Sequence, residues 1–313
     1  MRIQRAIPYV LGAALAGVLP LLTGAYLEQV AGSTMIYLTL ALSWDMLLRS
    51  GQLGFGTHGF FGLGSYAAVL LFLETDIHPF LSIAFGGLVA GAVATLIGLA
   101  VLRLRGMYFA ITTLALASIF SVVLRNLPQV SGGPEGKMLP SCIYAGDTTK
   151  VYWLILGLAL LTIVVSEVFE RTRIHLALTS IRNDERVAKT SGVNVFWYLV
   201  FVFAVTSAIQ GIAGGTYAHV FGFVSPEGSF SANFLLLPLA MALLGGIHST
   251  WGPVLGGLVL GALSEYLKLQ IPYGHLLVYG AIIVIVTLFL PQGIRGMLRA
   301  AMRRVPSARG EKP

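Results

Sequence analysis

Apolar runs of about 20 residues recur along almost the whole chain and are separated by short polar segments. A run of this length crosses a bilayer as a helix, whereas barrel strands alternate in polarity and need only about 10 residues. Charged residues make up 11% of the 313 residues, against roughly a quarter in soluble domains. The chain therefore cannot cover a water-facing surface, and the sequence predicts an all-α integral membrane protein, a polytopic helical bundle.

The apolar runs predict about ten membrane segments. We place them at 8–27, 31–48, 52–73, 80–102, 107–124, 151–168, 195–220, 233–247, 252–266 and 273–290. The eighth and ninth are short enough to be broken or re-entrant rather than full spans. The first resembles a signal peptide, but its apolar run continues to Tyr26, which favours a retained helix.

The basic residues indicate the orientation. With the N-terminus inside, 16 of the 20 Lys and Arg residues fall on the inner side. The remainder are Arg125, Lys137, Lys150 and Lys268. Cytoplasmic loops carry this excess, so both termini are expected in the cytoplasm and the net charge of +7 needs no nucleic acid. One membrane domain at 1–296 would precede a basic cytoplasmic tail at 297–313, expected to be disordered.

Two glycine-rich patterns resemble nucleotide-binding motifs but fail on their context. Gly54–Gly59 fits G-x-G-x-x-G, yet no strand precedes it and no acidic residue follows at the required distance. Gly132–Met138 resembles a phosphate loop, but Met138 stands where Ser or Thr must hold magnesium. The six histidines are scattered and Cys142 is the only cysteine. We expect no enzyme, no ATPase site of its own, no cofactor and no metal.

Ionisable residues within the predicted spans are candidates for function. Asp45 and Arg49 are four residues apart on the second segment and could pair along one helix face. Alternatively, Arg49 lies at the cytoplasmic interface and Asp45 only neutralises it. Glu167 and Glu265 are near predicted helix ends, where reaching water explains them.

A glycine-rich stretch, Gly51–Tyr66, reads GQLGFGTHGFFGLGSY. Glycines at this spacing allow a flat or interrupted helix that presses against a neighbour or lines a path. Our candidates for a translocation path or for helix packing are Gln52, Gly56, His58, Gly59, Gly62, Gly64, Gly245 and Gly246.

Three further segments carry patterns of the same kind: Arg103–Ala115, Met241–Gly256 and Leu290–Gly296. Together with Gly51–Tyr66 they resemble the permease subunits of ABC importers for branched-chain amino acids, specifically the M-type subunit. The resemblance runs from about residue 40 to 296 and departs at Gly54 and Thr57, where the family usually has Ser and His.

The resemblance implies a multi-pass permease subunit of an ATP-driven importer in the bacterial inner membrane, surrounded by lipid. It implies a second homologous permease subunit, two ATP-binding subunits and an extracytoplasmic solute-binding protein, and no nucleic acid. The solute stays open between branched-chain amino acids, urea, amides and aromatic acids. The alternative function is a secondary transporter or channel that works without ATP.

The polar loop at 169–194 is the expected coupling element. Glu185–Gly192 resembles the family's E-x-x-A-x-x-x-G pattern for the cytoplasmic helix that docks on the ATPase. Thr179, Asn183 or Asp184 could cap such a helix, and a glycine suits its end. Arg182, Arg186 and Lys189 would form one basic stripe. The candidate coupling residues are Arg182, Glu185, Arg186, Ala188, Lys189 and Gly192. Alternatively, the loop is solvated and only attracts anionic lipid.

Overall fold

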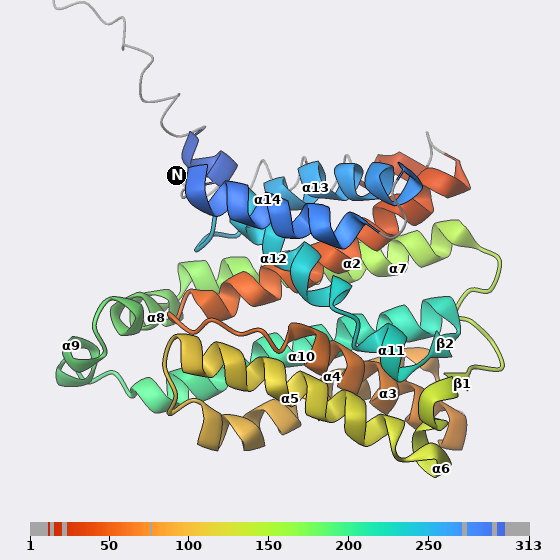
Figure 1. Cartoon of the computed structure of the whole chain (residues 1–313), viewed down its shortest axis with the longest axis horizontal. Coiled ribbons are helices and arrows are strands. Elements are labelled where there is room, and N and C mark those ends of the chain that lie inside the picture. Colours follow the sequence, from red (N-terminus) through yellow and green to blue (C-terminus); the bar gives the residue numbers. More distant parts are fainter. Residues whose placement is uncertain are drawn as a thin grey trace, which may run out of the picture.

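The computed structural model describes residues 12, 16–20, 24–75, 77–270, 274–289 and 293–297. Long helices run along the longest axis of the molecule (Figure 1). One layer consists of α3 (Thr57–Thr75), α4 (Pro79–Val101), α5 (Met107–Arg125) and α10 (Val195–Phe221). The other consists of α2 (Ala25–Leu48), α7 (Thr148–Arg171), α12 (Asn233–Gly245), α13 (Trp251–Gln270) and α14 (His275–Phe289). The layers meet where α2 packs against α10.

Short elements mark the two ends of the bundle (Figure 1). One end carries α8 (Arg173–Asn183) and α9 (Glu185–Thr190), and we name it the α8–α9 end. The opposite, β1–β2 end carries α6 (Pro128–Ser131), the 3₁₀ turn Gly133–Glu135, β1 (Lys137–Met138), β2 (Phe223–Val224) and α11 (Pro226–Ser229). The two strands pair antiparallel, with Lys137 opposite Val224.

The expectation of a polytopic helical membrane protein is confirmed. Within the described residues, six helical segments are long and apolar enough to cross a membrane, and the number of ten segments stays a prediction. The six are Ala25–Leu48, Pro79–Val101, Met107–Arg125, Thr148–Arg171, Val195–Phe221 and Pro226–Gly245. Two shorter apolar stretches, Trp251–Ser264 and Leu277–Val286, cover the ninth and tenth predicted segments.

The predicted break between the first two segments is wrong where the structure describes it. Helix α2 runs without interruption from Ala25, although Glu28 and Gln29 read as a polar loop in the sequence. The structure buries Glu28 against α7, where its carboxylate accepts a hydrogen bond from the Thr149 hydroxyl. Half of the segment at 8–27, and all but residue 297 of the tail at 297–313, lie outside the described residues. The cytoplasmic location of both termini stays a prediction.

Glycines bring helix backbones into direct contact within the α3–α4–α10 layer. A Cβ atom built on Gly64 would clash with the backbone of Gly211, and one on Gly86 would lie 2.5 Å from the Gly64 carbonyl oxygen. Three helices therefore meet at one point with no side chain between them. The other glycines of the α3 motif also face neighbours, since Gly59 packs on Ala117 and Gly62 packs on the Phe230 ring.

This contact predicts a specific sensitivity. Gly64→Ala should lower the free energy of unfolding by about 1–3 kcal/mol, because the added methyl group must displace the α10 backbone. Thermal unfolding of the purified protein in detergent measures the effect. Gly157→Ala on α7 is the matched control, since a Cβ there meets nothing within 4 Å. Equal melting curves for the two variants would contradict the assigned packing.

Candidate functional site

The predicted coupling loop forms two helices rather than one. Asp184 separates α8 from α9, and its carboxylate caps α9 by accepting hydrogen bonds from the Arg186 and Val187 backbone N–H groups at 2.7 and 3.3 Å. Arg182 is therefore on α8, whereas Arg186 and Lys189 are on α9. The single basic stripe was a wrong expectation, because the extended backbone of the capping residue interrupts the helical spacing.

The end of α9 has the geometry that the sequence indicates. Gly192 has a φ of +81°, in the left-handed region that favours glycine. The Val193 N–H donates to the Ala188 carbonyl at 3.0 Å and the Gly192 N–H to that of Lys189 at 3.1 Å. These bonds close the helix and direct the chain into α10.

Ala188 faces the interior of its own chain. It is 1% exposed and packs in a core cluster with Leu178, Ile181 and Val195. The exposed large apolar side chains of α8 and α9 are instead Leu176, at 67%, and Val187, at 59%. Sequence reasoning put Ala188 at a partner interface and missed Leu176, which reads as an ordinary apolar position of an amphipathic helix.

Glu185 joins α9 to another part of the bundle. Its carboxylate lies 2.6 Å from the Arg105 guanidinium and 2.9 Å from the Lys189 ammonium. Arg105 belongs to the turn between α4 and α5, where Gly106 has a φ of +54°. We name residues 172–194 the coupling arm, after the role that the sequence predicts for this loop. It is anchored by Ala188 in the core and by Glu185 on this turn.

The Asp45–Arg49 pair is completely enclosed. The two side chains are 0% and 2% exposed, and the Arg49 Nε lies 3.0 Å from the Asp45 carboxylate. This carboxylate also accepts hydrogen bonds from the backbone N–H groups of His248 and Ser249, in the turn between α12 and α13. Asp45 therefore does more than neutralise Arg49, because it also binds this turn. The position of Arg49 at the cytoplasmic interface stays a prediction.

Arg49 continues the cluster into α7. Its guanidinium donates to the Ser166 carbonyl and hydroxyl oxygens at 3.2 and 2.9 Å, and to the Thr250 hydroxyl at 3.4 Å. Glu170 in turn accepts from the Thr250 backbone N–H at 3.1 Å and from its hydroxyl at 2.9 Å. We name Asp45, Arg49, Ser166, Glu170 and Thr250 the buried charge cluster. Every charge in it is hydrogen-bonded, as burial requires.

Three sequence motifs converge around this cluster. A Cβ atom on Gly51 would lie 3.3 Å from the Arg182 Cα atom, so the first motif abuts α8. Gly293, in the last motif, packs on the backbone of Gly246, and Gly245 packs on that of Gly252.

Burial, together with the positive charges of Arg182 and Arg49, lowers the pKa of His248 to about 4, so His248 is neutral at pH 7.

The remaining predicted path residues pack between helices. The Gln52 amide donates to the Leu104 carbonyl at 3.5 Å, and Gly56 packs against Thr113, so the first motif also contacts the second. His58 is buried in α3. Within the described part of the chain, no group of three His, Cys, Asp or Glu residues could hold a metal ion.

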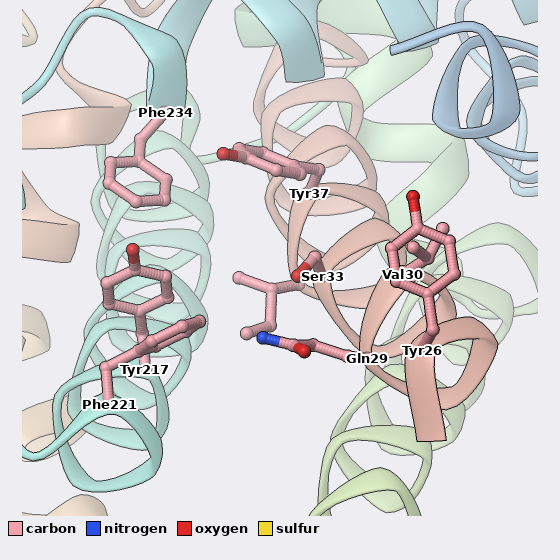
Figure 2. A pocket seen from close by; sticks show the side chains of 9 residues that line it. Tyr26, Gln29, Val30, Ser33, Tyr37, Tyr217, Phe221 and Phe234 are labelled. Carbon is pink, nitrogen blue, oxygen red and sulfur yellow. The ribbon is translucent and has the colours of Figure 1, made fainter. Parts of the chain in front are cut away.

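A cavity of about 290 Å³ opens at the β1–β2 end between α2, α10 and α12. Its walls consist of aromatic, aliphatic and uncharged polar side chains. They are Tyr26, Gln29, Val30, Ser33, Ile36, Tyr37, Tyr217, Phe221 and Phe234. Tyr217, Phe221 and Phe234 lie on one side, facing Gln29, Ser33 and Tyr37 on the other (Figure 2). Sequence reasoning missed this aromatic cavity, because its two walls are about 190 residues apart in the chain.

Apolar membrane helices around a cavity of this size define a polytopic membrane protein with room for a small solute. The chain belongs to the family described as branched-chain amino acid transport system / permease component, whose model matches residues 26–287. The resemblance drawn from the sequence motifs is confirmed.

Curated relatives agree with the M-type assignment. The chain is 29% identical to the high-affinity branched-chain amino acid transport system permease protein LivM of Salmonella typhimurium, over 91% of this chain and 73% of that protein. It is 26% identical to LivH of the same organism, over 85% of this chain and 92% of LivH. Among solved structures, PsaBC from Streptococcus pneumoniae aligns with a TM-score of 0.48 at 16% identity, covering 91% of this chain and 98% of that chain.

The buried charge cluster predicts a large difference between two arginines. Arg49→Met should lower the free energy of unfolding by about 3–5 kcal/mol, because two carboxylates lose their shared buried cation. Arg171→Met removes the same kind of i,i+4 pair, with Glu167, at a site where Arg171 is 46% exposed, and should cost at most about 1 kcal/mol. Thermal unfolding in detergent compares them. Similar losses of stability would argue against a buried cluster.

Proposed function

We propose that the chain is a transmembrane permease subunit of an ATP-driven ABC importer in the bacterial inner membrane. A second homologous permease subunit, two ATP-binding subunits and an extracytoplasmic solute-binding protein would complete it. The names of the relatives support branched-chain amino acids or related small solutes as cargo. On this proposal the α8–α9 end is cytoplasmic and the β1–β2 end is extracytoplasmic, in agreement with the distribution of basic residues.

The observation that carries the proposal is the coupling arm. It presents exposed Val187 on α9, close in sequence to exposed Arg186 and Lys189, and exposed Leu176 on α8. Exposed apolar side chains next to basic residues are typical of a protein interface. The arm is fixed behind this face by buried Ala188 and by the Glu185–Arg105 ion pair. Force applied by an ATPase would therefore move the arm together with the bundle.

The arm is also close to the buried charge cluster. Arg182 on α8 packs on Gly51, directly after the helix that carries Asp45 and Arg49. Displacement of α8 would thus reach the turn between α12 and α13. We assign Glu185, Ala188 and Gly192 to the support of the arm, and Val187, Arg186 and Lys189 to contact with the ATPase.

The rival function, a transporter or channel without ATP, finds less support. It would need buried, paired ionisable side chains along a path. The charges of the buried cluster instead bind the backbone of the turn at His248 and Ser249, and none of them lines the aromatic cavity. They are placed as structural anchors rather than as carriers of protons or ions.

The test replaces an exposed residue of the proposed contact face. Val187→Glu should abolish co-purification of the ATP-binding subunit and reduce ATP-dependent uptake to background, because it places a carboxylate in an apolar contact. The variant should still insert in the membrane at normal levels. Ala188→Glu would be a poorer test, since it buries the charge in the chain's own core.

Val130→Glu is the matched control, because Val130 is 46% exposed in α6 at the opposite end. It should retain the ATP-binding subunit. Normal ATPase binding and uptake by Val187→Glu would contradict the assigned face. Uptake that follows a proton or sodium gradient in the absence of ATP would favour the rival transporter.

A further inference from the structure

Glu28 is a buried carboxylate that forms no ion pair with a cation in the described part of the chain. The residue is 5% exposed, and among the described residues its side chain accepts one hydrogen bond, from the Thr149 hydroxyl at 3.0 Å. It takes part in no ion pair among the residues that the structure describes. A carboxylate offers about four acceptor positions, so the Thr149 bond leaves most of them unused. The N-termini of α2 and α7 stabilise the negative charge at this place.

Glu28 lines a second cavity of about 330 Å³. This cavity and the aromatic cavity share four wall residues, Gln29, Ser33, Ile36 and Phe221, so the two adjoin. The other carboxylate in the second cavity, that of Asp147, already accepts from the Lys150 backbone N–H and pairs with its ammonium at 2.9 Å. The neighbouring lysine lowers the pKa of Asp147 and satisfies its charge. Glu28 is therefore the carboxylate available to a ligand.

The aromatic cavity offers complementary chemistry. None of its nine lining side chains is charged. Ring faces dominate it: Tyr217 is 5.2 Å from Phe234 between ring centroids, and Tyr37 is 5.6 Å from Phe234. Such walls take up an aliphatic or aromatic side chain, while the Gln29 amide at the shared wall can donate to a carboxylate. A charged side chain would find no partner among these residues.

We propose that the two cavities form one solute site, in which Glu28 binds a primary ammonium group and Tyr37, Tyr217 and Phe234 enclose an apolar side chain. The inference rests on the proposed function, because it assigns a permeating solute to a permease. It selects a small apolar amino acid from the solutes that the sequence left open. Urea, simple amides and aromatic acids have no ammonium group for Glu28.

Cys142 makes the site testable, since the only cysteine of the chain lines the second cavity. The assembled importer, reconstituted without ATP and without binding protein, is labelled with N-ethylmaleimide in the presence of three probes. Leucine and 3-methylbutylamine carry the ammonium group, whereas 4-methylpentanoate has the same branched chain without it. Leucine and the amine should slow the labelling of Cys142, and the acid should not.

Glu28→Gln should raise the leucine concentration for half-maximal protection by roughly 10- to 100-fold, because the negative charge that faces the ammonium group is lost. Glutamine can still accept the Thr149 hydrogen bond, so the variant preserves the contact between α2 and α7. Asp147→Asn is the matched control in the same cavity and should leave the protection unchanged. Tyr217→Ala should weaken protection by leucine, whereas Tyr108→Ala, at a 75% exposed position on α5, should not.

Equal protection by the acid, or unchanged protection in Glu28→Gln, would overturn the site. If Cys142 reacts poorly with N-ethylmaleimide, a second reporter is used, Ser33→Cys in a Cys142→Ala background. If neither thiol reacts, the cavity is closed to solutes and the proposal fails. ATP-dependent uptake with the binding protein is measured separately. Normal uptake without protection of the thiol by leucine would support the permease function and contradict the solute site. Protection of the thiol without ATP-driven uptake would support the site and contradict the proposed importer.

Discussion

The carboxylate of Asp45 holds together parts of the chain that are distant in sequence. It accepts two backbone N–H groups of the α12–α13 turn and the Arg49 side chain, all away from solvent. A short apolar hairpin such as α12–α13 has free N–H groups at its turn, and a membrane interior has no water to satisfy them. Asp45 supplies the missing acceptors from α2, and Glu170 does the same for Thr250 from α7. The position of the second layer depends on these bonds.

Local signals in the sequence predicted the elements of the fold better than their contacts. Apolar length indicated the helices, Asp184 was among the predicted caps, and Gly192 was expected at a left-handed helix end. The start of α2 was misplaced because Glu28 is polar in sequence, while its burial depends on Thr149, 121 residues away. Hydrophobicity within one helix carries no information about such a partner.

For the candidate sites too, the sequence predicted local elements better than the contacts between them. The pattern around Glu185 located the coupling arm, but could not say which face of α9 turns inward. Ala188 is buried because α8 and α10 pack around it, and Val187 is exposed for the same reason. The aromatic cavity had no sequence motif at all, since Tyr37 and Tyr217 approach each other only through the packing of α2 near α10. Glycine and charge motifs in the sequence identified the candidate site at the α8–α9 end. The cavity at the β1–β2 end could be found only in the structure.

The glycine contact between α3, α4 and α10 has a mechanical consequence. Helices whose backbones touch cannot slide past one another without separating, so these three form a stiff unit around Gly64 and Gly211. Helices α2, α7 and α12 form another unit, held together by the hydrogen bonds of Arg49, Asp45 and Glu170. The seam between the units passes between α2 and α10, where the Gln210 amide donates to the Ser43 hydroxyl and Leu40 and Ala213 belong to one apolar cluster. The aromatic cavity lies on this seam, so a small rotation of one unit against the other changes its width before it disturbs either interior.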